Sequence, residues 1–256
     1  DKREVYRHLR DGALALFSNG DEWADGFRLE AAQTAARPSV AIVEENEATI
    51  TRILPNALPL PGRHNRVNFA FAALAARGLG VSDDTIRAAA GDFPGVPHRL
   101  ETVGTLRHVR FVNDTAATIP EACAAAIDAY LSDSSYEAVD LIAGGTDKGL
   151  DPTPLLRAFS AVVSNGGSVV LLRGSATERI VRELERAALP VPPVFDDIES
   201  AVSASARNAL HATRPAERGE RVVLLSPGCT SFGMFQNEFD RGRQFSAIAR
   251  RIVESG

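Results

Sequence analysis

The sequence predicts an α/β fold in which helices cover both faces of a mostly parallel sheet. From about residue 96, runs rich in valine, leucine and isoleucine alternate with longer segments whose apolar residues recur at helical spacing. Such strands, each followed by a helix, are typical of a parallel sheet buried on both faces. Three polar clusters, at 113–118, 144–149 and 226–233, each follow an apolar run. Since α/β proteins bind ligands at the carboxyl ends of parallel strands, we expect these clusters to meet at one edge of the sheet.

The first 95 residues predict a smaller α/β segment. Three prolines within 54–62 remove backbone donors, so this stretch cannot lie inside a helix or a strand. Pro38 is expected to end one helix, and Ser82 is placed to cap the start of another. The expected elements are, in chain order, a helix at 1–10, a strand at 12–19, a helix at 25–38, a strand at 39–45, and helices at 63–80 and 82–93.

The rest of the chain carries the alternating pattern. Pro120 stands near the start of a helix, where a missing backbone N–H costs nothing. The expected strands lie at 109–114, 138–145, 168–174 and 221–227, and the expected helices at 118–131, 151–163, 176–189, 198–212 and 239–254.

Composition excludes several classes of protein. The 256 residues are 45% apolar and 24% charged, which indicates a globular chain with a real core. The net charge is -5 and no basic block is present, so neither nucleic acid nor an anionic membrane is expected as the main partner. Two cysteines make no disulfide framework and favour a reducing cytoplasm. No apolar run approaches the roughly 20 residues that cross a bilayer. The chain opens on Asp1 inside a helical pattern, so we expect a part of a longer gene product.

The segment LIAGGTDKGLD, 141–151, raises the question of a phosphate-binding loop. A P-loop needs four residues between its glycines, followed by Gly-Lys and then Ser or Thr. Here Lys148 precedes Gly149 and Leu150 follows, so the spacing excludes a P-loop. A lysine beside hydroxyl donors and a helix N-terminus is instead typical of a carboxylate site. Lys148 is therefore interpreted as a carboxylate clamp.

Each candidate side chain also has a plain structural interpretation. Thr118 and Ser231 can be helix caps, Lys148 a solvated surface lysine and Asp114 a turn acid. Arg99, in GVPHRLE, is placed either to reach a phosphate or to form a hinge salt bridge. Three such clusters at three strand ends favour the functional interpretation over the structural one.

Five segments resemble one known family, in the same order and at similar spacing: PGRHNRVN, GVPHRLE, FVNDTAAT, IAGGTDKG and LLSPGCTSFGMFQNEFDRGRQF. The chain resembles the Mur ligases, most closely the members that add D-glutamate to UDP-N-acetylmuramoyl-L-alanine in peptidoglycan synthesis. The resemblance is strong over 60–256 and weak over 1–59. It implies that 1–95 is the second half of the central ATPase domain. Residues 96–256 would be the whole C-terminal Rossmann-like domain, which binds the incoming amino acid.

The resemblance also implies a reaction. ATP phosphorylates the carboxylate of the nucleotide-linked muramoyl-alanine, and the amine of glutamate attacks the acyl phosphate. ATP and Mg²⁺ are the implied cofactors, and UDP-N-acetylmuramoyl-L-alanine and glutamate the implied partners. The implied ATP contacts are Asn65, Arg99 and Asp114, the glutamate contacts are Thr118, Lys148 and Ser231, and Lys148 and Asp114 are the catalytic residues. No metal ligand is assigned, and Lys2 is the candidate for a family lysine that is carbamylated to support magnesium. The UDP-binding domain and the P-loop are not in these 256 residues, so we expect this chain alone not to hydrolyse ATP.

Two departures from the family pattern touch the expected amino-acid pocket. Where the family has Asp-Ser-Lys-Ala-Thr-Asn, this sequence has DTAATI, so Ala116 replaces a lysine and Ile119 an asparagine. Near the end, Glu238 stands where an aromatic residue is usual. A ligase that adds L-glutamate is therefore an open alternative. Two others are a different amide ligase of the superfamily, such as a folylpolyglutamate synthetase, and a non-catalytic module that binds an amino acid or a nucleotide.

Overall fold

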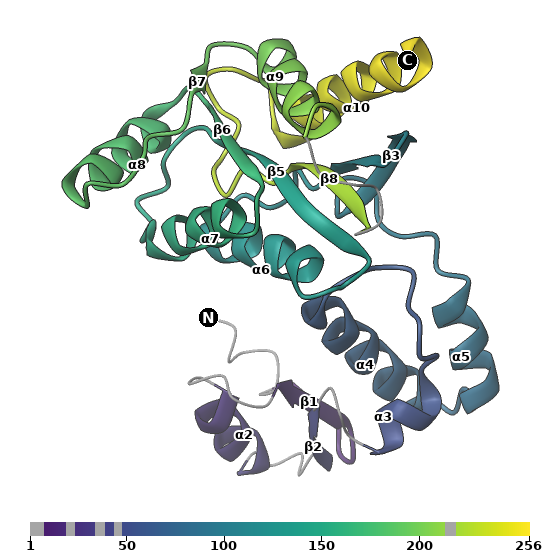
Figure 1. Cartoon of the computed structure of the whole chain (residues 1–256). Helices are drawn as coiled ribbons and strands as arrows, with labels where there is room; N and C mark the ends of the chain where they lie inside the picture. Colours follow the sequence, from purple (N-terminus) through teal and green to yellow (C-terminus); the bar gives the residue numbers. More distant parts are fainter. Residues whose placement is uncertain (1–7, 19–23, 34–38, 44–47, 213–218) are drawn as a thin grey trace. The chain divides into compact units, whose positions relative to one another are not determined.

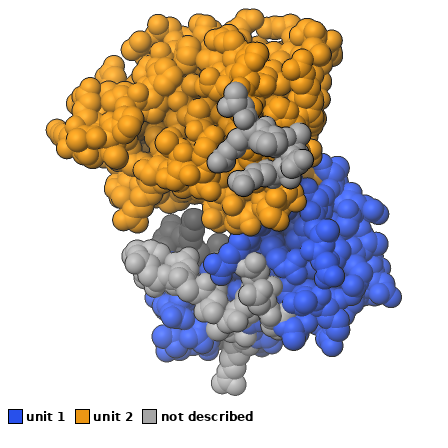
Figure 2. Space-filling view, in the orientation of Figure 1, with its two compact units in different colours: residues 1–94 blue, residues 95–256 orange. Residues whose placement is uncertain are grey.

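A computed structural model describes the chain except residues 1–7, 19–23, 34–38, 44–47 and 213–218. The chain divides into two compact units, residues 1–94 and 95–256 (Figure 2). Most of the helix expected at 1–10, and Lys2 with it, lies outside the described residues. No helix in the described part of the chain is both long and apolar enough to cross a lipid bilayer.

The first unit is a small α/β assembly. Its two strands pair in parallel, with Leu14 opposite Ser39. Its core contains Ile50, Ile53 and Ala70, which are fully buried. The Ser82 side chain caps the last helix by accepting a hydrogen bond from the Thr85 N–H, as the sequence predicts. The elements are β1 (Leu14–Ser18), α2 (Ala24–Ala32), β2 (Ser39–Val43), α3 (Ala48–Ile53), α4 (Arg63–Gly78) and α5 (Asp83–Gly91).

The second unit contains a six-stranded sheet in the order β3-β4-β8-β5-β6-β7. Only β3 runs antiparallel to its neighbour, so the sheet is mostly parallel, as predicted. Its strands are β3 (Glu101–Leu106), β4 (Val109–Asn113), β5 (Tyr136–Gly144), β6 (Ser168–Leu172), β7 (Val194–Phe195) and β8 (Glu220–Leu225). Its helices are α6 (Pro120–Leu131), α7 (Thr153–Ser164), α8 (Ser175–Arg186), α9 (Ile198–Leu210) and α10 (Glu238–Ser255).

Helices cover both faces of this sheet (Figure 1). Alternate residues of a strand point to opposite faces, and β5 shows this with Leu141 in one core cluster and Ile142 in the other. The first cluster also contains residues of α6, α7 and α8, and the second residues of α9 and α10. Because both faces are buried, the strands are apolar almost throughout rather than alternating with polar residues.

A buried ion pair lies toward the amino-terminal ends of the strands. Arg221 donates through Nη2 to Asp140 Oδ2 (3.0 Å), and Ser168 Oγ donates to Asp140 Oδ1 (2.6 Å). Both charged side chains are almost fully buried. Burial raises the pKa of Asp140, although Ser168 and Arg221 oppose the shift. This pair joins β5 to β8 away from the polar clusters of the strand ends.

Candidate functional site

The three polar clusters meet at the carboxyl edge of the sheet, as the sequence predicts. In the central parallel strands, Asn113 of β4 and Ile142 of β5 both lie opposite Leu225 of β8. Asp114 lies in the segment after β4, Lys148 in the segment after β5 and Ser231 in the segment after β8. The topology therefore brings residues more than 100 positions apart to one edge.

The loops after β5 and β8 are joined by a short antiparallel bridge. The Thr146 N–H donates to Thr230 O (2.9 Å), and the Thr230 N–H donates to Thr146 O (3.1 Å). Thr230 Oγ1 adds a further bond to Thr146 O (2.9 Å). Gly145 makes this close approach possible, because its φ is +136° and a Cβ there would lie 2.3 Å from Thr230 O. The two loops are fixed to each other by backbone hydrogen bonds.

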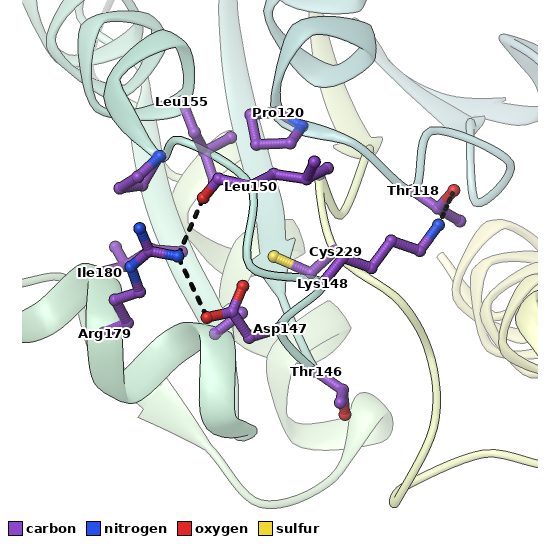
Figure 3. A pocket seen from close by; sticks show the side chains of 13 residues that line it. Thr118, Pro120, Thr146, Asp147, Lys148, Leu150, Leu155, Arg179, Ile180 and Cys229 are labelled. Atoms are coloured by element: carbon purple, nitrogen blue, oxygen red, sulfur yellow. Dashed lines mark hydrogen bonds and ion pairs between the residues drawn. The ribbon is translucent and has the colours of Figure 1, made fainter.

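Lys148 projects from the loop after β5 toward Thr118 (Figure 3). Its Nζ lies 3.3 Å from Thr118 Oγ1. Among the described residues, no carboxylate forms an ion pair with Lys148. Beside it is a small cavity of about 20 Å³, lined by Thr118, Pro120, Thr146, Asp147, Lys148, Leu150, Pro152, Leu155, Ala176, Arg179, Ile180, Gly228 and Cys229. The site thus presents a hydroxyl group and an ammonium group that is paired with no described carboxylate.

Arg179 approaches the same loop from α8. Its Nη1 donates to Asp147 Oδ2 (3.2 Å) and to Leu150 O (2.9 Å). Unlike Lys148, this cation already has a carboxylate partner. Cys229 also lines the cavity, but burial raises the pKa of its thiol to about 12, so it is a neutral thiol at neutral pH.

Thr118 and Ser231 differ from the structural roles considered for them. Neither is a helix cap, because α6 has Ile119 at its N-cap position and α10 has Asn237. Ser231 is buried and does not line the cavity beside Lys148. Thr118 and Lys148 therefore lie together, whereas Ser231 is buried in the loop after β8.

Asp114 is buried directly after β4. Its Oδ1 accepts from the Leu100 N–H (3.2 Å) and its Oδ2 from Ser226 Oγ (2.8 Å). Burial raises the pKa of Asp114 to about 7, although these hydrogen bonds and the charge of Arg99 oppose the shift. Oδ1 thus holds the segment that carries Arg99, which is itself exposed, and Oδ2 is bonded to the segment after β8. Asn65 belongs to the other unit, where its amide donates to Pro61 O (2.8 Å).

Arg241 was not predicted from the sequence, and its side chain is fully buried at this edge. Its guanidinium donates to Thr115 Oγ1 (2.9 Å), Thr115 O (3.0 Å) and Cys229 O (3.2 Å). Burial lowers its pKa to about 10, so it stays charged at neutral pH. It ties the segment after β4 to the loop after β8. Its place on one helical stripe with Phe245 and Ile248 was the signal that could have shown its burial.

The three residues that make up the two departures from the family pattern lie at the same edge. Ala116 is half-buried, Ile119 is exposed and Glu238 begins α10 in a half-buried position. The backbone carbonyl of Glu238 accepts from Thr115 Oγ1 (3.0 Å). The aromatic ring nearest in sequence, Phe239, lies with its centroid 5.8 Å from that of His98.

The described residues form no cluster of metal-ligating side chains. No three His, Cys, Asp or Glu side chains are grouped to hold a metal ion in the part of the chain that the structure describes. The cationic and hydroxyl groups that do meet at this edge suit an anion instead.

The chain is similar in sequence to several proteins that are named as ligases. The chain is 47% identical over 198 residues to a UDP-N-acetylmuramoylalanine–D-glutamate ligase of Roseiflexus sp., covering 77% of this chain and 38% of that protein. Ligases of the same name from Bacteroides fragilis and Salinibacter ruber are 35% and 32% identical over 84% and 99% of the chain, and over 46% and 54% of their own lengths. The chain therefore spans about half or less of the length of these relatives. No family model matches the chain.

Solved structures share the fold at low sequence identity. MurF from Acinetobacter baumannii has a TM-score of 0.67 at 18% identity, over 96% of this chain and 53% of that one. MurF from Thermotoga maritima, in complex with ADP, has a TM-score of 0.59 at 15% identity, over 99% and 57%. A folylpolyglutamate synthase/dihydrofolate synthase from Yersinia pestis has a TM-score of 0.54 at 15% identity, over 99% and 56%. The MurF ligases and the folylpolyglutamate synthase therefore share this fold. The sequence relatives reported above carry the name of the UDP-N-acetylmuramoylalanine–D-glutamate ligases, not that of a folylpolyglutamate synthase.

Proposed function

Because this chain belongs to the Mur ligase family, we propose that it is part of an ATP-dependent amide ligase of peptidoglycan synthesis. The proposed reaction joins glutamate to the alanine carboxylate of UDP-N-acetylmuramoyl-L-alanine through an acyl phosphate. The names of relatives up to 47% identical support this substrate pair. The observation that carries the proposal is Lys148, a cation without a carboxylate partner among the described residues, 3.3 Å from Thr118 Oγ1 at the ligand-binding edge of the sheet.

The two units correspond to two parts of that enzyme in this proposal. Residues 1–95 are the second half of the central ATPase domain, and 96–256 are the amino-acid-binding domain. The geometric division at 94/95 and the sheet of the second unit support this assignment.

Lys148 binds the side-chain carboxylate of the incoming glutamate in the proposed mechanism. Its ammonium supplies a charge-assisted hydrogen bond, and Thr118 Oγ1 donates a neutral one beside it. Ser231 is the third proposed glutamate contact, although it is buried and does not line the cavity beside Lys148. Holding the carboxylate fixes the amino acid so that its amine can attack the acyl phosphate, which is catalysis by orientation.

Asp114, Arg99 and Asn65 are assigned to ATP, which supplies the phosphoryl group that activates the alanine carboxylate. Asp114 accepts from the Leu100 N–H, next to Arg99, and so restrains the backbone that presents the Arg99 guanidinium. Arg99 then offers its exposed charge to phosphate oxygens.

A second candidate is a ligase of the same kind that adds L-glutamate. Ala116, Ile119 and Glu238 replace the lysine, asparagine and aromatic residue usual in the family, and all three lie at the edge that carries Lys148. Separate titrations of the purified chain with D-glutamate and L-glutamate decide between the two candidates by which enantiomer binds more tightly.

Replacing Lys148 tests the proposed function. A charge-assisted contact is worth roughly 1.5–3 kcal/mol, so Lys148→Ala should weaken glutamate binding about ten- to a hundred-fold. Lys148→Arg keeps the charge but not the compact ammonium, and should give an intermediate loss. Isothermal titration of the chain with glutamate and with ATP measures both affinities.

Arg157→Ala removes an exposed cation from α7 and is the matched control, with glutamate affinity expected to be unchanged. ATP affinity should hardly change in Lys148→Ala. Loss of ATP binding with glutamate binding intact would make Lys148 a phosphate ligand and overturn the assignment.

A further inference from the structure

Lys148 lies in a tight turn that is closed by a hydrogen bond between the residues on either side of it. Asp147 Oδ1 accepts a hydrogen bond from the Gly149 N–H at 2.8 Å, two residues along the chain. Gly149 has a φ of +73°, in the left-handed region that glycine adopts without strain. Such an aspartate turn fixes the direction of the backbone but leaves the long side chain of the residue between free.

Arg179 fastens this turn to α8. The same nitrogen, Nη1, donates to the Asp147 carboxylate before Lys148 and to the Leu150 carbonyl after it. A second link runs from the Asp147 N–H to Ser175 Oγ (3.1 Å) at the start of the helix. The Arg179 and Asp147 side chains are 35% and 30% exposed, so the pair is partly shielded from solvent. Lys148 is thus held on both sides by one side chain.

We propose that Arg179 is a positioning residue for Lys148. It holds the turn at 147–150 against α8 so that the ammonium group reaches Thr118, and it does not itself bind the substrate. The ligand side of this inference rests on the proposed function, in which Lys148 takes a carboxylate.

The alternative of Arg179 as a direct carboxylate ligand conflicts with its bonding. Its nearest carboxylate is Asp147, and a substrate carboxylate would have to displace that partner or the Leu150 carbonyl. Lys148 offers the same charge with no ion pair to break among the described residues. The geometry therefore separates an arginine that orders the loop from a lysine that contacts the ligand.

Composition makes this hypothesis unusually easy to test. Lys148 is one of only two lysines in the sequence, and the other is Lys2. A chain labelled with ¹³C-lysine gives two sets of side-chain signals, and Lys148→Arg assigns them. The nuclear Overhauser effect between the Lys148 ε-methylene and the Thr118 methyl then reports on their contact without any ligand.

We expect Arg179→Met to abolish that effect and to weaken glutamate binding about two- to ten-fold, the cost of ordering one or two side chains on binding. Arg179→Lys can still meet Asp147 but cannot reach Leu150 O in the same geometry, so it should retain part of both signals. Asp147→Asn should have the same effects as Arg179→Met. The double variant should lose no more glutamate affinity than either single variant, because all three remove the same ion pair between Arg179 and Asp147. Arg186→Met is the control, since Arg186 is on the same helix and, among the residues that the structure describes, forms an ion pair only with Glu183 (2.8 Å).

The outcomes separate this inference from the proposed function. If Arg179→Met or, should that variant not fold, Arg179→Lys keeps the Lys148–Thr118 contact and full glutamate affinity, the positioning role is wrong. A larger loss of glutamate binding in Arg179→Met than in Lys148→Ala would make Arg179 a direct ligand and also overturn it. If Lys148→Ala leaves glutamate binding unchanged while Arg179→Met still removes the contact, the proposed function fails and the positioning role stands.

Discussion

Asp114 has hydrogen-bond partners for both the charged and the neutral form of its carboxyl group. As a carboxylate it accepts from Leu100 N–H and Ser226 Oγ, and when protonated it can donate to Ser226 Oγ instead. Burial sets the balance and raises its pKa from 3.8 to about 7. At neutral pH this group is therefore divided between its two protonation states.

The raised pKa of Asp114 gives a testable pH dependence. Between about pH 4 and 7 the folded state keeps a proton that the unfolded state has released, so this group's stabilisation is complete below pH 4 and is lost as the pH rises through 7. Asp114→Asn mimics the protonated form at every pH. Relative to the wild-type chain, its free energy of unfolding should rise by up to about 4 kcal/mol across that window. Urea denaturation of both proteins from pH 4.5 to 8 measures this difference, and a difference that does not vary with pH would contradict the prediction.

The residues that sequence could identify at the site are those that follow strands. Thr118 and Lys148 could be placed together because each lies just beyond a strand of a parallel sheet. Arg179 and Arg241 could not, because their partners are backbone carbonyls and loop residues that come close only after folding. The sequence does not indicate which backbone carbonyl the side chain of a basic residue in a helix will contact.

The strands that could be predicted from the sequence are those buried on both faces of the sheet, because they are apolar almost throughout. Strands β4, β5, β6 and β8 were expected within a few residues of their observed bounds. Three elements were missed: β3 (Glu101–Leu106), β7 (Val194–Phe195) and α3 (Ala48–Ile53). β3 is an edge strand that contains Gly104, and it packs on one face against α10 through Val253. β7 and α3 have 2 and 6 residues, too few for periodicity to show.

The loop after β5 depends on a glycine that closely approaches another backbone. At Gly145 an alanine would combine a left-handed φ of +136° with a Cβ placed 2.3 Å from Thr230 O, so the bridge to the loop after β8 would have to open. We expect Gly145→Ala to lower the free energy of unfolding by more than about 2 kcal/mol and to weaken glutamate binding. Gly149→Ala is the control in the same loop, because its φ is +73° and nothing lies within 4 Å of the added carbon. It should cost only about 1 kcal/mol. Chemical denaturation compares the two variants, and equal losses would show that the close approach is unimportant.

At the scale of the whole molecule, each unit has its own hydrophobic core. The cluster around Ile50 and Ala70 contains only residues of 1–94, and the two clusters on the six-stranded sheet contain only residues of 95–256. A fragment of 95–256 keeps both of these clusters and should fold without the first unit. Its melting temperature should lie within about 4 °C of the corresponding transition in the whole chain, the shift that roughly 1 kcal/mol produces at this size.

Differential scanning calorimetry of the fragment and of the whole chain makes the comparison. A fragment without a cooperative transition would show that the second unit depends on the first for its stability. A fragment that folds and binds glutamate as the whole chain does would place the amino-acid site entirely within 95–256.

The bridge between Thr146 and Thr230 has a consequence for how a ligand binds at this edge. A loop that is free in the unbound protein loses conformational entropy when a ligand orders it, and that loss reduces the affinity. Here the loops after β5 and β8 are already joined through their own backbones, and Arg241 ties the second of them to the segment after β4. Their conformational freedom was lost when the protein folded. If an anion binds at Lys148 as proposed, it has mainly side chains left to order, and little of its binding free energy is lost in ordering the backbone.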